Sequence, residues 1–275
     1  MRQTIKIAET IIEANFNHRD APFGPVYDPF ASSGEPDIII RVAPGAYEGE
    51  KGGMHFECPP IWTLYRHKRK SLIDIFPDLN GTVNTLIFGS PLCEAELYLG
   101  KESQNPFCSP TMELLMVNYL AQGKGIILHA CGVVWEGEGL LFVGESGAGK
   151  STMARLWSKE DGAEVVSDDR TVVRQKGNEF WMYGTPWHGE EKFASPGAAR
   201  LERIFFLSKR KVNALRPLRG VDPVSRFLIC SFPPYWDSRG MAFTLKFLTE
   251  MATRVHCEEL SFKPDRSVVE MLGGQ

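Results

Sequence analysis

Apolar and polar positions alternate with a period near two over most of the first hundred residues. This period is typical of strands, and turn clusters rich in Gly, Pro, Ser and Asp separate the apolar runs. The pattern predicts strands at Thr4–Phe16, Asp37–Val42, Met54–Tyr65, Thr82–Phe88 and Glu96–Leu99. The basic run Tyr65–Lys70 is expected to be a solvated hairpin edge rather than a phosphate or nucleic-acid patch.

Helical spacing begins after a short linker at residues 106–110. Ser109 can cap a helix that has Pro110 at its first position, and apolar side chains follow from Leu114 to Leu120. The glycines at 123 and 125 end this helix. We therefore expect a β-rich accessory region over residues 1–105 and a second domain over residues 106–275.

The second domain mixes short strands with helices, which indicates an α/β fold. We expect strands at Leu140–Val143, Val165–Val166, Leu201–Leu207 and Arg254–Phe262, and helices at Ser151–Lys159, Met241–Thr253 and Arg266–Leu272. The segment Ser231–Trp236 is apolar and rich in turn-forming residues. Buried packing between helices is its expected role, with a lid or an oligomer contact as alternatives.

Composition and charge narrow the classes of partner. The chain has 275 residues, 43% of them apolar, and a formal charge of −3. A protein that binds nucleic acid through phosphates is normally more basic, so we expect no nucleic-acid partner. The amino-terminal segment lacks the apolar run of a signal peptide, and no stretch reaches 18 apolar residues. The expectation is a soluble, cytoplasmic protein without a membrane partner.

The six cysteines show neither C-x-x-C spacing nor a Cys/His cluster. Structural zinc therefore lacks its usual ligand pattern, and a disulfide framework is not expected in a chain of this length. We interpret Cys58, Cys93, Cys108, Cys131, Cys230 and Cys257 as ordinary buried or semi-exposed thiols.

The strongest chemical signal is the segment GESGAGKS at residues 144–151, which matches G-x-x-x-x-G-K-[ST] at every position. Glycines let successive backbone N–H groups point at one phosphate, and the following helix adds its positive dipole end. The lysine reaches the β- and γ-phosphates, and the Ser151 hydroxyl is suited to Mg²⁺. The predicted nucleotide-binding residues are Gly144, Glu145, Ser146, Gly147, Ala148, Gly149, Lys150, Ser151 and Thr152.

A phosphate loop of this kind also needs a carboxylate for the metal. Asp168 and Asp169 follow Lys150 by 18 and 19 residues, enough for one helix and a returning strand. That strand is expected to lie beside Leu140–Val143, with both aspartates at its carboxyl end, where open α/β sheets bind ligands. One acid of such a pair can hold Mg²⁺ while the other accepts a proton from an attacking hydroxyl. The alternative is a turn or a helix cap, in which Asp is also common.

Together, Leu128-His129-Ala130, the phosphate loop and Ser167-Asp168-Asp169-Arg170 resemble the catalytic domain of HPr kinase/phosphorylase over roughly residues 125–210. That family phosphorylates a protein serine and shares its fold with phosphoenolpyruvate carboxykinase. The resemblance implies a carboxykinase-like P-loop domain with a mixed sheet, preceded here by the β-rich region. It also implies that His129 lies beside the phosphates, that Asp168 is the general base, that Asp169 and Ser151 bind Mg²⁺, and that the chain forms a homo-oligomer.

The sequence departs from the family pattern at two places. Ala130 replaces a glycine, and the Glu-x-Arg-Gly signature after the aspartates is absent. In its place stands the segment Tyr183–Lys192, which contains a histidine, two acids, a lysine and a tryptophan between Thr185 and Lys192. One hypothesis is that this segment lines the acceptor pocket, with Glu190 near the metal. The alternative is a proline-punctuated loop around a buried Trp187.

These residues predict an ATP- and Mg²⁺-dependent kinase, a phosphotransferase whose acceptor is a hydroxyl on a protein, a peptide or a small molecule. A cation must also stabilise the departing charge, and the sequence offers Arg170, Lys192 and Arg239 without choosing among them. Two other functions stay open: a nucleotide hydrolase that acts as a switch, and a non-catalytic module whose binding is gated by nucleotide. A carboxykinase is a weaker alternative because the chain is short for that enzyme.

Overall fold

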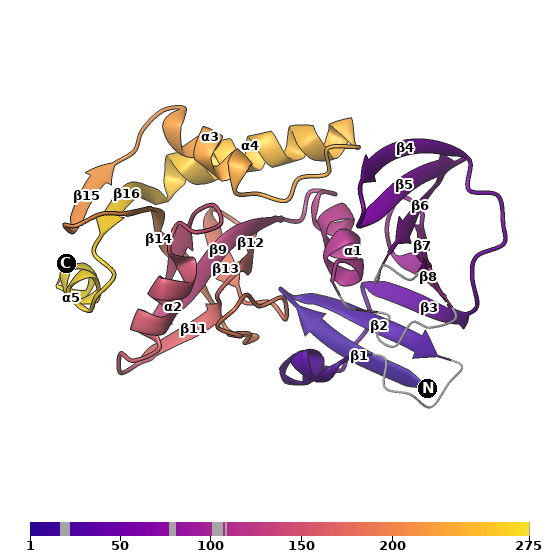
Figure 1. The fold of residues 1–275 in the computed structure, drawn as a ribbon, viewed down its shortest axis with the longest axis horizontal. Helices are drawn as coiled ribbons and strands as arrows, with labels where there is room; N and C mark the ends of the chain where they lie inside the picture. Colours follow the sequence, from indigo (N-terminus) through magenta and orange to yellow (C-terminus); the bar gives the residue numbers. More distant parts are fainter. Residues whose placement is uncertain (17–22, 77–80, 101–106, 108, 275) are drawn as a thin grey trace. The chain divides into compact units, whose positions relative to one another are not determined.

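The computed structural model describes residues 1–16, 23–76, 81–100, 107 and 109–274. The chain divides into two compact units, Met1–Tyr119 and Leu120–Gln275 (Figure 1). Both contain a large sheet with parallel and antiparallel pairs, so the protein is a mixed α/β protein. The sequence placed the boundary earlier, at residues 105 and 106. No helix among the described residues is both long enough and apolar enough to cross a membrane.

The sheet of the first unit has the strand order β1-β2-β3-β8-β7-β6-β5-β4. Among the described residues of this unit, the parallel pairs are β2 with β3 and β3 with β8. Its strands are β1 (Arg2–Ile7), β2 (Thr10–Phe16), β3 (Ile38–Pro44), β4 (Gly53–Cys58), β5 (Trp62–His67), β6 (Lys70–Ile75), β7 (Asn84–Phe88) and β8 (Glu94–Leu99). A 3-10 helix, η1 (Pro25–Phe30), and the helix α1 (Thr111–Leu120) complete the unit's regular structure among the described residues.

Two strands expected from the sequence are hairpins in the structure. Thr4–Phe16 reverses direction at Ala8 and Glu9, which both have positive φ, and Met54–Tyr65 is broken by the turn that contains Pro59 and Pro60. The first turn uses no Gly, Asn or Pro, so no residue type indicated it. The second turn contains two prolines, which favour a turn, but the alternating pattern around them led to the prediction of a strand.

The basic run Tyr65–Lys70 forms the hairpin turn between β5 and β6, as predicted. The predicted helix is present as α1, but it begins at Thr111, so Pro110 precedes the helix and does not occupy its first position. The helix ends at Leu120, and part of the expected linker lies outside the described residues. Of the cysteines, Cys131, Cys230 and Cys257 are buried, Cys58 is half-buried and Cys93 is exposed, all as free thiols. Cys108 lies outside the described residues.

Five strands of the second unit pair in a closed ring. β10 pairs with β9, β9 with β12, β12 with β13, β13 with β14, and β14 returns to β10. β16 extends β14 in parallel, β15 follows at the edge, and β11 pairs with β9. The strands are β9 (Ile126–Trp135), β10 (Glu138–Val143), β11 (Ala163–Ser167), β12 (Arg170–Lys176), β13 (Glu179–Tyr183), β14 (Ala198–Lys209), β15 (Ala214–Pro217) and β16 (His256–Phe262).

Two apolar clusters lie on opposite faces of these strands, and β9 shows how the sequence builds them. Leu128 and Ala130 belong to one cluster and Cys131 and Val133 to the other, because neighbouring strand positions point to opposite faces. The first cluster packs against α3 (Asp222–Ile229) and α4 (Ser238–Arg254), and the second against α2 (Lys150–Trp157) and α5 (Ser267–Gly273). Figure 1 shows α4 and α2 on different sides of the strands.

One prediction about this sheet is wrong. The strand that carries the aspartates was expected beside Leu140–Val143, but β11 pairs with β9, which separates it from β10. The reason is that β9 and β10 form a tight hairpin, so the β10 edge beside β9 is already occupied. The other edge of β10 is taken by β14. The aspartates nevertheless lie only one strand away from the loop, because β9 pairs with β10 on one side and with β11 and β12 on the other.

The segment Ser231–Trp236 was expected to be buried between helices, and this is only partly so. Pro233 and Pro234 are buried, whereas Phe232 is 36% and Tyr235 is 59% exposed. Phe232 stacks beside Arg170, whose guanidinium carbon lies 5.2 Å from the ring centre. A guanidinium cation is attracted to the face of an aromatic ring even when the ring is partly exposed to solvent.

Candidate nucleotide and phosphoryl-transfer site

The phosphate-loop motif occupies the predicted strand–loop–helix unit, between β10 and α2. Gly147 and Gly149 have φ values of 82° and 115°, a region that side chains with a Cβ rarely adopt. At Gly144 a Cβ would lie 2.6 Å from the Cβ of Ala148, so the loop closes on itself at its start. Three glycines of the motif are therefore required by backbone geometry, independently of any ligand.

Lys150 is folded back over the loop. Its ammonium group donates hydrogen bonds to the carbonyl oxygens of Gly144, at 2.8 Å, and Glu145, at 3.1 Å. The side chain is only 6% exposed. Burial lowers the pKa of its amine, and the negative charge of Asp169 works in the opposite direction. In the rest of the motif, Glu145, Ser146 and Gly147 are exposed, and Ser151 and Thr152 are half-buried in the first turn of α2.

The acid pair lies directly across β9 from the start of the phosphate loop. Val143, the last residue before the loop, is paired with Ala130 on one side of β9. On the other side, the Ala130 N–H donates to the carbonyl oxygen of Asp169 at 2.9 Å. One strand therefore separates the first glycine of the loop from the aspartates, and the charges of Lys150 and Asp169 influence each other.

Asp169 is held between two basic side chains. His129 Nε2 lies 2.8 Å from Asp169 Oδ1, and Arg170 forms an ion pair with Oδ2. Burial raises the pKa of the Asp169 carboxyl, but the hydrogen bond from His129 and the charges of Arg170, His129 and Lys150 outweigh it, so the pKa lies below its ordinary value. Asp169 is therefore an ionised carboxylate at neutral pH.

Asp168 has different partners and is almost completely covered. It is 2% exposed, and its Oδ1 and Oδ2 accept hydrogen bonds from the backbone N–H groups of Gly189 at 2.7 Å and Glu191 at 2.9 Å. We call the segment 189–191 the strap. It lies against the acid pair, because a Cβ on Gly189 would lie 3.0 Å from Asp168 Oδ2 and 3.2 Å from Asp169 Cβ.

The strap is also tied to the helix that follows the phosphate loop. Arg155, on α2, forms an ion pair of 3.2 Å with Glu191. Trp187 is buried, as the loop alternative anticipated, and Glu190 is exposed. The acceptor-pocket role of Thr185–Lys192 and the metal role of Glu190 stay predictions. The strap's bonds to Asp168 were not foreseen, because backbone donors leave no signature in the sequence. The ion pair of Arg155 was not foreseen either, because it joins segments that are distant in the sequence.

The three cations considered from the sequence lie in different surroundings. Arg170 is half-buried and is engaged by Asp169 and by the ring of Phe232. Lys192 is exposed at a backbone φ of 61°, and Arg239 is exposed in the first turn of α4. Of the three, only Arg170 contacts a member of the acid pair among the described residues.

Among the described residues, no three His, Cys, Asp or Glu side chains are grouped so that they could hold a metal ion by themselves. A Mg²⁺ ion at a phosphate loop needs only one or two protein oxygens, because phosphates and water supply its other ligands. The hydroxyl of Ser151 and the carboxylate of Asp169 are hard oxygen donors of the required type. A carboxylate has about four lone-pair positions, so the bonds from His129 and Arg170 leave Asp169 able to accept another ligand.

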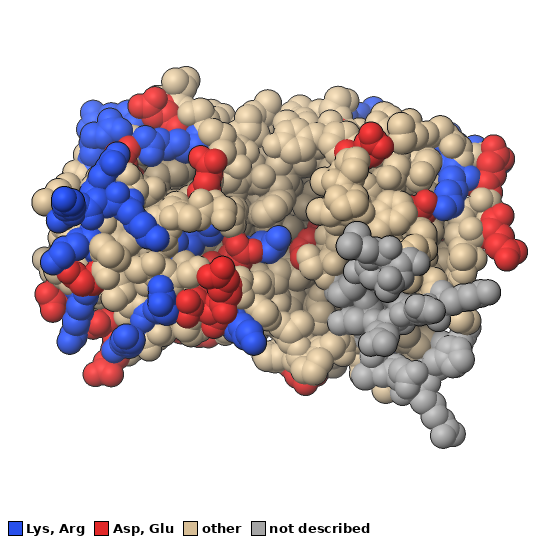
Figure 2. All heavy atoms as spheres, in the orientation of Figure 1, with Lys and Arg blue, Asp and Glu red and all other residues tan. Residues whose placement is uncertain are grey.

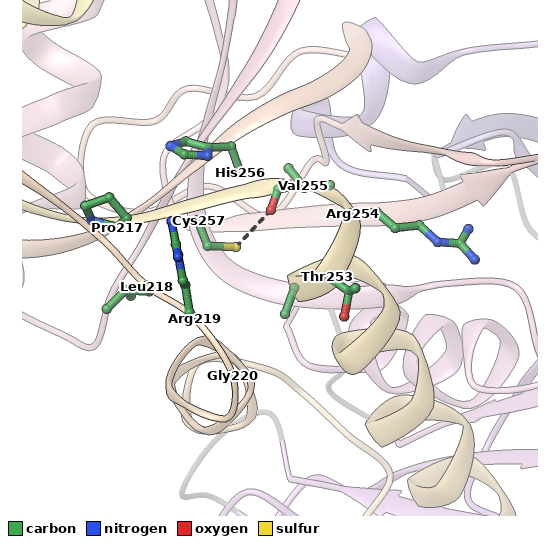
Figure 3. Close-up of a pocket in the computed structure, with 10 residues that line it drawn as sticks. Pro217, Leu218, Arg219, Gly220, Thr253, Arg254, Val255, His256 and Cys257 are labelled. Carbon is green, nitrogen blue, oxygen red and sulfur yellow. Dashed lines mark hydrogen bonds between the residues drawn. The ribbon is translucent and has the colours of Figure 1, made fainter.

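A separate cavity of about 640 Å³ lies elsewhere in the second unit, between residues 217–220 and 252–257. Figure 3 shows the Arg219 side chain extending toward Cys257, while Arg254 points away from the cavity. The sulfur of Cys257 donates to the carbonyl oxygen of Val255 in the wall. None of the predicted site residues lines this cavity, so it is distinct from the phosphate-loop site.

Comparisons with known proteins give little at the level of sequence. No family model and no curated protein matches the chain. Among solved structures, the HPr(Ser) kinase/phosphatase of Coxiella burnetii is similar with 13% identity and a TM-score of 0.32. The match covers 54% of this chain and 86% of that one.

Proposed function

We propose that the protein is an ATP- and Mg²⁺-dependent kinase that transfers a phosphoryl group to a hydroxyl, on a protein, a peptide serine or a small molecule. In this proposal, Leu120–Gln275 is an HPr-kinase-like P-loop domain with a carboxykinase-like fold. The supporting observation is the position of Ala130, which is bonded to Asp169 on one side and paired with the residue before the phosphate loop on the other. A glycine turn without function would not require two adjacent carboxylates at that point.

The phosphate loop would bind the nucleotide with its backbone N–H groups and with Lys150. To do so, the Lys150 ammonium exchanges its bonds to Gly144 and Glu145 for phosphate oxygens, which carry more negative charge than carbonyl groups. Ser151 and Asp169 would hold the Mg²⁺. When bound, this ion would neutralise charge on the β- and γ-phosphates. His129 fixes the orientation of the Asp169 carboxylate.

Asp168 would accept the proton of the attacking hydroxyl. A base must come within hydrogen-bond distance of the proton that it removes, and the strap covers Asp168. The acceptor must therefore displace the strap or replace its N–H groups at the carboxylate. This requirement favours transfer to a bound acceptor over transfer to water, because a specific acceptor can supply the energy that opens the strap.

The test is phosphoryl transfer by the full-length protein. Purified protein is incubated with γ-labelled ATP and Mg²⁺ in an extract of the source organism, and the labelled product is identified. General-base catalysis contributes about 10²–10⁴-fold, so Asp168→Asn should lower turnover by about that factor and largely preserve ATP affinity. Lys150→Ala should weaken both binding and turnover.

Three results would contradict the proposal. Slow release of phosphate that needs no acceptor would indicate a hydrolase that acts as a switch. Tight binding of ATP without consumption in any extract would indicate a nucleotide-gated binding module. Loss of ATP binding in Asp168→Asn, with normal turnover per bound nucleotide, would show that Asp168 serves nucleotide binding and is not the general base.

A further inference from the structure

A second lysine, Lys209, lies beside the phosphate loop although it is 59 residues from Lys150 in the sequence. β14 runs parallel to β10, so the carboxyl ends of both strands reach the same edge of the sheet. A Cβ on Gly144 would lie 3.6 Å from the Cβ of Leu207, and Lys209 follows two positions later as the last residue of β14. Ligands of α/β sheets bind at this edge.

The Lys209 side chain closes over the turn that begins α2. A Cβ on Gly149 would lie 3.0 Å from Lys209 Cε and 2.5 Å from Phe262 Cζ, so the aliphatic part of the lysine packs against the glycine. Lys209 is exposed, and its ammonium group forms no hydrogen bond or ion pair with any described residue, although its backbone lies in the ladder with β16. Figure 2 shows further Lys and Arg side chains gathered over the part of this unit that carries β14 to β16.

Different groups approach the phosphate loop from its two sides. The acid pair and His129 approach the loop from the β9 side of β10, whereas Lys209 approaches from the β14 side. A polyphosphate whose terminal phosphate faces Asp169 would extend its other phosphates toward Lys209. The N–H groups at the start of the helix hold the α- and β-phosphates in loops of this type.

We propose that Lys209 binds the non-transferred phosphates of the nucleotide, at the α/β end of the chain, and so favours a nucleoside polyphosphate as the donor. This inference rests on the proposed function and extends it to a residue that no sequence motif marks. Lys209 contacts phosphates that change little during transfer. Its contribution should therefore be equal in the ground state and the transition state, which affects KM and leaves kcat nearly constant.

The test compares Lys209→Met with Lys246→Met in the full-length protein. Lys246 is a matched control because it is a lysine on α4 whose side chain is 76% exposed and lies 3.8 Å from Glu250. We expect Lys209→Met to weaken the affinities for ATP and for ADP by the same factor, on the order of tenfold for a charge-assisted hydrogen bond. Lys209→Arg should restore most of the affinity, and Lys246→Met should leave it unchanged.

The outcomes separate this inference from the proposed function. If the wild-type protein binds no nucleotide, the proposed function fails. If wild type and Lys246→Met bind ATP and Lys209→Met binds it equally well, only the role of Lys209 is refuted. A loss for ATP without a loss for ADP would place Lys209 at the transferred phosphate and overturn the assignment. Thermal unfolding of each variant checks that it is folded, and Lys209→Gln provides a second neutral substitution.

Discussion

The phosphate loop permits a matched pair of glycine substitutions that separates backbone strain from steric overlap. Gly147 and Gly149 both have positive φ, at 82° and 115°. A Cβ on Gly147 would meet no atom within 4 Å, whereas one on Gly149 would lie 2.5 Å from the ring of Phe262. Alanine at position 147 therefore adds only strain, and alanine at position 149 adds both effects.

The expected magnitudes follow from these distances. A residue with a Cβ held at positive φ costs roughly 1–2 kcal/mol. Overpacking against a buried side chain costs roughly 1–3 kcal/mol more, and Phe262 is fully buried and cannot easily move. We expect Gly147→Ala to lower the free energy of unfolding by about 1–2 kcal/mol and Gly149→Ala by about 2–5 kcal/mol. For a domain of this size, each kcal/mol lowers Tm by roughly 2–4 °C.

The assay is thermal and urea unfolding of both variants, followed by unfolding of the double variant Gly149→Ala/Phe262→Leu. The smaller leucine should recover part of the stability that Gly149→Ala loses, even though Phe262→Leu alone destabilises the fold. Equal stabilities of Gly147→Ala and Gly149→Ala would refute the described packing of Phe262 on the loop. A double variant whose loss equals the sum of the single losses would refute it as well.

Three further predictions concern the neighbourhood of the site and the thiols. Arg155→Ala should release Glu191 and loosen the strap, which faster backbone hydrogen exchange at residues 189–191 would reveal; unchanged exchange would show that the ion pair does not hold it. Because the pKa of Asp169 is depressed below 3.8, its ion pairs stabilise the fold above that pH and are lost as pH falls through the lower native value. Wild type should therefore exceed Asp169→Asn in urea stability at pH 7, with a gap that narrows toward pH 3; a constant gap would contradict this. Burial raises the pKa of Cys257 to about 12, so a thiol reagent at pH 8 should modify exposed Cys93 rapidly and Cys257 only after unfolding; rapid labelling of Cys257 in the native protein would contradict its burial.

The parts of the site that could be predicted are those whose chemistry is local in the sequence. The phosphate loop requires glycines, a lysine and a hydroxyl within eight positions, and a strand and a helix flank it as expected. The acid pair could be recognised because two adjacent aspartates follow a short apolar strand. Its position beside β9 rather than β10 could not, because strand order depends on pairings between distant segments.

The remaining features depend on contacts that the sequence does not encode locally. The strap is held to Asp168 by backbone N–H groups, which every residue except proline possesses. Lys209 reaches the loop only because β14 pairs in parallel with β10. In the first unit, the turn at Ala8 and Glu9 lacks the residues that usually mark a tight hairpin, so an unbroken strand was predicted there.

Nucleotide binding at the loop is tested by the affinity of the full-length protein for ATP in the presence of Mg²⁺, measured by titration calorimetry for wild type and Lys150→Ala. In the proposed function, the loop binds a polyphosphate and the buried Lys150 turns from its own loop to that ligand. We expect saturable one-to-one binding by wild type and at least tenfold weaker binding by Lys150→Ala, the loss typical of a charge-assisted contact. Equal affinities in the two proteins, or no binding by wild type, would contradict the claim.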